Sequence, residues 1–222
     1  MRIIICLLFW LPIAAKAITY DELSPQEKSK VSSGQIVVKL TPIDNAPWPS
    51  IDVFSTVKAS PLESLALFLA LDIQKDYVPN LLKSRPIKHI SATEVHTEYI
   101  MDLPWPIPNG YYVHGSDFKK TPQGYRAMWY MVQSDSANSV NGFAQFNQDG
   151  LFHYHSRVSP KSALATLLKG LMVKDVEKTV EAIRSFIETT IEKNPKLLKK
   201  YVSYIERSLR GEFVYEAQIR SE

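Results

Sequence analysis

The sequence has one cysteine among its 222 residues, and this residue, Cys6, lies close to the start of the chain. A single thiol cannot form an internal disulfide, so a small scaffold held together by disulfides is excluded. An excess of one charge is also lacking, since 26 Lys and Arg residues face 23 Asp and Glu residues, a net charge of +3. Nucleic-acid binding requires a concentrated basic surface, so we expect no nucleic-acid partner.

Apolar runs long enough to cross a bilayer are absent as well. The run from Ile3 to Ile13 is shorter than the roughly 20 residues that a spanning helix needs. It follows Arg2 and precedes Ala15 and Ala17 in an A-x-A arrangement, a pattern typical of a signal peptide cleaved after the second alanine. We therefore predict an exported, soluble, monomeric protein, periplasmic in a bacterium and secreted otherwise. An uncleaved membrane anchor is the alternative.

The remaining composition is that of an ordinary folded domain, with 45% apolar and 11% aromatic residues. Near its start, Ser24, Pro25 and Glu27 form a helix-capping pattern and predict a short polar helix. Residues 35–43 and 50–59 are rich in β-branched side chains and predict two strands. The first segments after the signal peptide thus combine one helix with two strands.

A second capping pattern, Ser60, Pro61 and Glu63, precedes leucines at helical spacing. It predicts a helix over 61–71 that continues in pieces to Leu82.

Residues 87–159 return to alternation, broken by Gly, Pro, Asn and Asp. No helix-like segment separates these strands, so an antiparallel meander is predicted rather than a parallel sheet. Ser159 and Pro160 then predict the start of a long helix with one apolar stripe, and Pro195 the start of a shorter one. The expected organisation is a signal peptide at 1–17, an N-terminal segment at 18–33, a main domain at 34–192 and a C-terminal helix and tail at 193–222.

Three segments resemble the START-like, or helix-grip, superfamily. The segment 60–81 is similar to the first helix of that family, with Asp72, Tyr77 and Pro79 after the helix. The segment "MDLPWPIPNGYYV" is similar to the Leu-Pro-aromatic-Pro segment of the family, and "NGFAQFNQDG" with "LFHYHSRVSP" resembles its later pair of strands. The resemblance covers roughly residues 34–190.

The resemblance implies an α+β helix-grip fold, in which a curved antiparallel sheet wraps around a long C-terminal helix and encloses a hydrophobic cavity. It further implies that the chain binds, and transfers, a lipid or another hydrophobic small molecule, without a cofactor and without being an enzyme. A polyketide cyclase-like enzyme that uses the same cavity is the alternative. Many members carry an Arg-Asp pair after the proline segment, whereas Gly110 and Tyr111 stand here. The role of that pair is therefore not carried over.

Alternation along the strands selects the side chains that face the long helix. On the last strand, Phe152 and Tyr154 share a face, with His153 and His155 opposite. The predicted ligand-binding residues are Val57, Val95, Tyr99, Met101, Trp129, Met131, Phe152, Tyr154, Leu164, Leu168 and Met172. A filled core without a cavity is the competing interpretation of the same pattern.

Polar side chains offer a different hypothesis. His153 and His155 leave one face of a strand together, and Glu94, His96 and Glu98 do the same on another, so adjacent strands would create a zinc site. The simpler interpretation is a solvated sheet face. Acid–base chemistry would use the same groups, but no nucleophile elbow, phosphate loop or zinc-protease helix is present.

Two further features of the sequence are a tryptophan between prolines and a basic segment near the C-terminus. Trp105 lies between prolines that stop one strand before the next begins, and we expect it to pack against the end or rim of the sheet. The segment 193–210 is basic and amphipathic. It either contacts an anionic membrane surface transiently or packs on the domain with its charged face in water.

Overall fold

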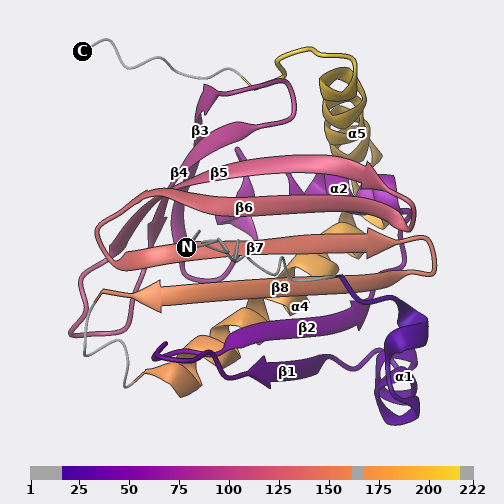
Figure 1. Cartoon of the computed structure of the whole chain (residues 1–222). Helices are drawn as coiled ribbons and strands as arrows, with labels where there is room; N and C mark the ends of the chain where they lie inside the picture. Colours follow the sequence, from indigo (N-terminus) through magenta and orange to yellow (C-terminus); the bar gives the residue numbers. More distant parts are fainter. Residues whose placement is uncertain (1–16, 162–167, 216–222) are drawn as a thin grey trace, which may run out of the picture.

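The computed structural model describes residues 17–161 and 168–215. They form one sheet of eight strands with helices against it (Figure 1). The strands are β1 (Val37–Thr41), β2 (Ser50–Thr56), β3 (Leu81–His89), β4 (Val95–Met101), β5 (Gly110–Thr121), β6 (Gly124–Ser134), β7 (Ala137–Asn147) and β8 (Leu151–Pro160). The helices are η1 (Tyr20–Glu22), α1 (Pro25–Ser32), α2 (Pro61–Phe68), η2 (Gln74–Asp76), α4 (Lys169–Lys193) and α5 (Pro195–Leu209). The expected α+β class is confirmed.

The strands lie in the order β1-β2-β8-β7-β6-β5-β4-β3, and every neighbouring pair is antiparallel. Strands β3 to β8 form the predicted meander. Strand β8 also pairs with β2, where Val53 lies opposite Tyr154, so the early strands join the end of the meander. Register shifts in the β3–β4, β5–β6 and β7–β8 pairs mark irregularities of the kind that bend a sheet.

Helix α2 begins where the capping pattern predicts. The Ser60 hydroxyl accepts from the Glu63 N–H at 3.3 Å, and the Glu63 carboxylate accepts from the Ser60 N–H at 3.0 Å. Ser24 and Glu27 make the same reciprocal pair at the start of α1. Helix α2 is buried from Ser64 to Phe68 because it lies between the sheet and helices α4 and α5.

Helix α4 is packed unevenly along its length. The buried residues of α4 are Val180, Ile183, Ile187 and Thr190. Residues 169–179 contain no buried side chain. Arg184 holds the second half in place, since its Nη1 donates to the Gly34 carbonyl at 2.8 Å and to the Ser55 hydroxyl at 3.0 Å. The fully buried side chains of α4 therefore lie in its second half, while Met172, Val173 and Val176 of the first half are partly buried where they pack against the core.

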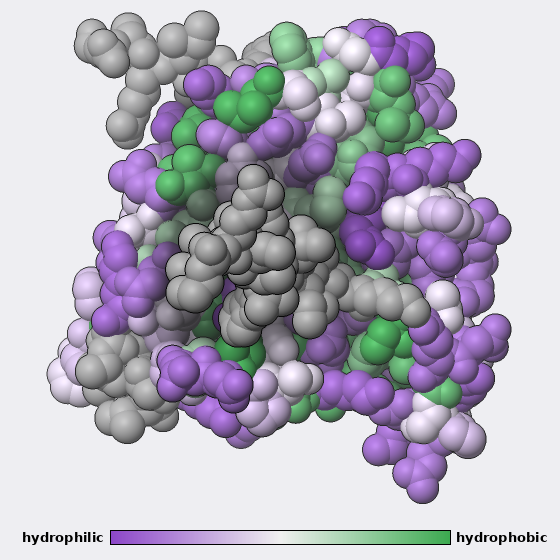
Figure 2. Space-filling view, viewed as in Figure 1, coloured by the Kyte–Doolittle hydropathy of each residue, from purple (hydrophilic) through white to green (hydrophobic). Residues whose placement is uncertain are grey.

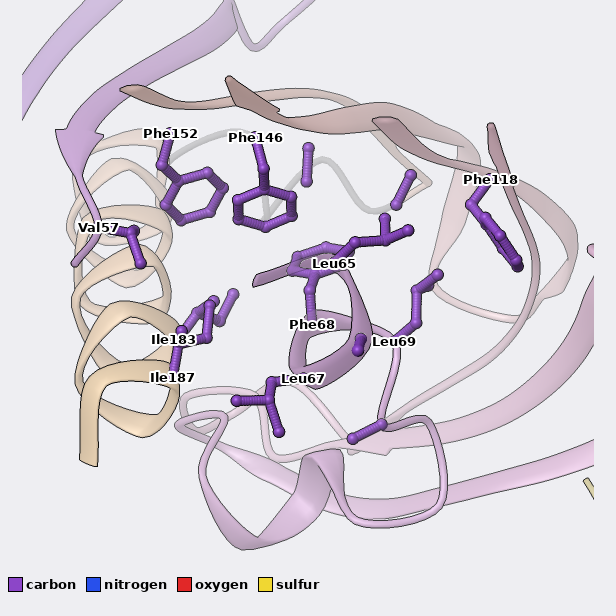
Figure 3. Packing of buried hydrophobic residues seen from close by; sticks show 14 of the residues in the cluster. Val57, Leu65, Leu67, Phe68, Leu69, Phe118, Phe146, Phe152, Ile183 and Ile187 are labelled. Carbon is purple, nitrogen blue, oxygen red and sulfur yellow. The ribbon is translucent and has the colours of Figure 1, made fainter. Parts of the chain in front are cut away.

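The core around that half contains aromatic rings from β7 and β8 (Figure 3). Phe146 and Phe152 stack with ring centroids 4.7 Å apart, and both rings extend from the sheet into the space between α4 and α2. Val57 lies beside them, while Ile183 and Ile187 approach from the helix. Phe146 and Phe152 are buried and are not part of the cavity lining, so these rings belong to the packed core.

Two predicted element boundaries are wrong. The helical pieces expected up to Leu82 end at η2, and Leu81 already begins the edge strand β3. The alternating region expected to begin at residue 87 begins earlier, because β3 already runs from Leu81 to His89 before a turn leads to β4. Strand β3 tolerates Pro86 because an edge strand leaves one side of its backbone unpaired.

The long helix does not begin at Pro160. That residue is the last of β8 and lies opposite Ala137 of β7. Strand pairing outweighs the local Ser-Pro capping signal, because it adds ladder hydrogen bonds and buries Pro160. Helix α4 starts at Lys169, and residues 162–167 lie outside the described part of the chain.

Helix α5 begins after Pro195 as predicted, with the Asn194 side chain accepting from the Leu197 N–H at 3.2 Å. Its buried residues face the domain, where the Tyr201 hydroxyl donates to Asp72 at 2.7 Å. The apolar face of the basic segment thus packs on α2. Among the described residues, no helix has the length and apolar character needed to cross a membrane.

Candidate ligand-binding site

A cavity of about 800 Å³ lies between the sheet, the segment from α2 to η2 and the first half of α4. Its size falls in the range of roughly 300–1,000 Å³ that is typical of small-molecule sites. Phe68 and Leu69 line it from α2, Trp129 from β6, and Met172 and Val176 from α4. The α4 residues of the lining extend along one side of the helix from Leu171 to Ile183.

The structure places the predicted ligand-binding residues in three groups. Six line the cavity: Tyr99, Met101, Trp129, Tyr154, Leu168 and Met172. Three are buried in the core and do not line it: Val57, Val95 and Phe152. Met131 is half-buried and is not part of the lining, and Leu164 lies outside the described residues.

Val57, Val95 and Phe152 share the inward face with the lining residues, and for this reason the alternation pattern selected them. Facing inward is not sufficient, however, because the inward face meets packed side chains at one end and open space at the other. Phe152 extends into the packed core beside Phe146, near Ile183 of α4 (Figure 3). Tyr154, two residues further along β8, lines the cavity.

Several lining residues were missed because they are polar. They include Gln74 of η2, His114 and Ser116 of β5, and Ser156 of β8. Tyr112, His114 and Ser116 follow one another at every second position of β5, so alternation alone could have identified this face. The imidazole and hydroxyl groups concealed it, since an inward face is normally recognised by apolar residues.

The polar groups on the enclosed wall are uncharged or already paired. The Tyr99 hydroxyl donates to the Gln74 carbonyl oxygen at 2.7 Å, and the Gln74 amide donates to the Phe68 carbonyl at 2.9 Å. Burial raises the pKa of Tyr154 to about 12, so its hydroxyl stays protonated. Burial lowers the pKa of His114 to about 4, so its ring is neutral at neutral pH. The wall therefore combines apolar surface with a few neutral hydrogen-bonding groups.

Solved structures of the same shape decide the fold. The STAR-related lipid transfer protein fragment from Xanthomonas axonopodis superposes with a TM-score of 0.61 and 18% identity, over 68% of this chain and 93% of that one. Human STARD10 superposes with a TM-score of 0.57 and 15% identity, over 79% of this chain and 76% of that one. The human StAR-related lipid transfer protein 5 superposes with a TM-score of 0.57 and 9% identity, over 70% of this chain and 83% of that one. This chain has a START-like helix-grip fold.

The likeness is one of structure rather than sequence, since no protein-family model and no curated protein matches the chain. In this START-like fold, the segment that links β4 to β5 borders the cavity through Leu103, Pro104, Pro106, Ile107 and Pro108. The segment turns at Trp105 and Pro106, where the Ile107 N–H donates to the Pro104 carbonyl at 3.1 Å. Its prolines have no N–H to donate, so this wall consists mainly of apolar atoms.

Trp105, in the same segment, does not pack against the sheet. Its side chain is 91% exposed, so the expected packing against the sheet end is wrong. The flanking prolines line the cavity, while the tryptophan points to the outside. Consecutive residues on both sides of Trp105 line the cavity, so strand-like alternation does not describe this turn, and the local sequence does not indicate that the tryptophan points outward.

The opposite face of the sheet carries mostly hydrophilic side chains in the view of Figure 2. His153 and His155 lie on this face in β8, and a ring N–H of each donates to the same Asp52 carboxylate oxygen at 2.8 Å. His153 is fully buried, because Phe54 stacks on it at 4.4 Å and the Ile18 N–H donates to its Nδ1 at 3.1 Å. This part of the face is thus covered by the N-terminal segment rather than solvated.

The two sets of candidate metal ligands do not meet. Glu94, His96 and Glu98 belong to the β4 region, which β5, β6 and β7 separate from β8. Glu98 pairs instead with Lys83 at 2.7 Å and Arg85 at 2.9 Å. Over residues 17–161 and 168–215, no group of three or more His, Cys, Asp or Glu side chains is arranged to hold a metal ion.

Proposed function

We propose that this protein binds, and transfers, a lipid or another hydrophobic small molecule in the cavity beneath the first half of α4. The observation that supports the proposal most strongly is the cavity of about 800 Å³ with its largely apolar wall. Burial of apolar surface provides the driving force for such a ligand, at about 25 cal/mol per Å². Structures of the same fold are described as lipid transfer proteins, which agrees with this proposal.

The experiment is extraction of the purified protein with organic solvent, followed by mass spectrometry, together with uptake from a broad lipid panel. We expect the wild-type protein to carry or take up an apolar molecule. A protein that never does so would contradict the proposal. Conversion of the bound molecule into a new product would instead favour the cyclase-like alternative.

A variant that fills the cavity gives a sharper version of this test. Thr179 of α4 lines the cavity and is half-buried, so Thr179→Trp is expected to occupy the space and to reduce uptake at least tenfold. Glu181→Trp introduces the same side chain on the exposed side of the same helix and is the matched control. Equal uptake by the two variants would show that the ligand binds elsewhere.

We also propose that residues 1–17 direct export and are removed, so that the mature protein begins at Ile18. The apolar run with its A-x-A site supports this proposal. Intact-mass measurement and N-terminal sequencing of the exported protein test it. A retained N-terminal segment would favour the membrane-anchor alternative.

A further inference from the structure

The charged side chains of the cavity lie at its outer end. Within the described residues, the charged lining residues are Asp135, Lys161 and Asp175. Asp135 and Lys161 are exposed, and both are engaged: Asp135 accepts from the Tyr111 N–H at 2.9 Å, and the Lys161 ammonium donates to the Ser134 carbonyl at 2.7 Å. Asp175, in the first half of α4, is half-exposed.

The enclosed wall therefore offers no counter-ion to a charged ligand group. Moving a carboxylate, phosphate or ammonium from water to this wall would remove its hydration without replacing it by an opposite charge. A ligand group that reaches the enclosed wall must be uncharged to bind there favourably.

Two side chains that line the cavity have an enclosed nitrogen without a partner among the described residues, Trp48 at Nε1 and His114 at Nε2, and of the two only the imidazole can both donate and accept. Neither ring nitrogen of His114 has a hydrogen bond to the described residues, and its Nε2 is enclosed by protein atoms. The rings of Tyr99 and Tyr112 flank it, with centroids 5.3 Å and 5.7 Å away. Buried polar groups without a partner are rare in folded proteins, and such groups commonly interact with a ligand or with water.

The neighbouring polar groups do not satisfy the ring. Tyr99 and Gln74 bond to each other, which leaves the Tyr99 hydroxyl committed as a donor. A neutral imidazole has one N–H donor and one acceptor nitrogen. A hydroxyl group can pair with either nitrogen, and a carbonyl group can pair with the donor.

We propose that the ligand is an apolar molecule with an uncharged hydroxyl or carbonyl group, and that His114 selects this group. The inference rests on the proposed binding function and specifies its ligand class. The apolar remainder of the molecule then lies against Phe68, Trp129 and the first half of α4, where the wall is hydrophobic. The exposed charges stay at the outer end, in contact with water.

The test uses four ligands that share a sixteen-carbon chain and differ only in the end group: hexadecan-1-ol, hexadecanal, palmitate and hexadecane. Each competes with the fluorescent dye Nile red for the purified full-length protein. We expect wild-type protein to bind the alcohol and the aldehyde about tenfold more tightly than the alkane, the size of one hydrogen bond. We expect palmitate to bind more weakly than the alcohol.

Two variants assign the preference to the imidazole. His114→Leu is expected to lose the tenfold preference and to bind hexadecane as tightly as wild type does. His96→Leu, the same change on the other face of the adjacent strand β4, is expected to keep the preference. His114→Gln retains a donor and an acceptor and is expected to keep part of it.

A purely structural role of His114 predicts a different result. If the ring stabilised the fold, His114→Leu would melt at a lower temperature without ligand. Because the ring lacks a partner, we expect the same or a higher melting temperature. If Nile red and hexadecane bind, but neither the end group nor His114→Leu changes the affinity, the inference about His114 is overturned and the proposed binding function is not. Failure of the dye and of all four ligands to bind would overturn the proposed function itself.

Discussion

Phe152→Ala is expected to lower the free energy of unfolding by about 3–5 kcal/mol, the range for removing a buried phenylalanine ring. Phe152 is fully buried and stacks on Phe146 with ring centroids 4.7 Å apart. The deletion leaves a void between β8 and the second half of α4, where Arg184 and the packed isoleucines restrict collapse. Chemical denaturation followed by circular dichroism measures the loss.

Tyr154→Ala is the comparison variant for Phe152→Ala. Tyr154 is two residues away on the same strand face, but it borders the cavity and is only half-buried. Its removal enlarges a space that already exists, so we expect a clearly smaller loss of stability and a larger loss of ligand binding. Equal losses of stability in the two variants would mean that the core and the cavity are not distinct.

Asp52→Ala is expected to cost about 1–3 kcal/mol of folding free energy, because it leaves a buried donor unpaired. Asp52 holds His153 and His155 through one carboxylate oxygen. His153 is completely buried, so its ring is shielded from solvent that could replace that partner. Asp21→Ala is the matched control, since the Asp21 carboxylate is 98% exposed and its ion pair with Lys28 spans 3.7 Å. We expect this control to change stability by less than about 0.5 kcal/mol.

The same cluster predicts how stability depends on pH. Burial favours the neutral acid of Asp52, but hydrogen bonds from His153 and His155 outweigh it and hold the pKa below its ordinary value. Burial lowers the pKa of His153, and the carboxylate only partly offsets this. Both groups bind protons more readily in the unfolded chain, so their contribution is complete above the unfolded pKa values and is lost as the pH falls.

For His153 the loss begins near its ordinary pKa of 6.5, and for Asp52 near 3.8. Unfolding free energies of wild-type protein measured between pH 8 and pH 3 should therefore decrease toward acid. Asp52→Ala should show a smaller decrease below about pH 4, because one of the two titrating groups is gone. Stability that rises as the pH falls from 7 to 4 would contradict this account of the cluster.

Local sequence determined much of the fold. Ser24 and Ser60, each followed by proline and then glutamate, specify the starts of α1 and α2 because the capping bonds are made within four residues. Alternation determined the meander, since side chains leave a strand on opposite faces regardless of its neighbours. Where pairing competed with a local signal, as at Pro160 and along β3, the distant partner strand prevailed.

The tertiary structure alone decided which inward residues border a cavity. Phe152 and Tyr154 have the same periodicity and the same strand, yet one is packed under α4 and the other faces open space. The difference depends on which distant segments cover each side chain, and α4 is one such segment, joined by Arg184 to Gly34 and Ser55. Those contacts join segments about 130 to 150 residues apart, so no local pattern contains them.

The polar residues also separate what the sequence determined from what the tertiary structure decided. The sequence determined that His114 and His153 lie on strands, but it did not reveal that the first ring lines an apolar cavity. It also did not reveal that Ile18 and Phe54 cover the second. Burial of a polar side chain depends on which surfaces are folded over it, and here those surfaces come from distant parts of the chain. The sequence by itself therefore determined the secondary structure, the meander and the resemblance to the helix-grip fold, while the cavity and the chemistry of its wall were decided by packing.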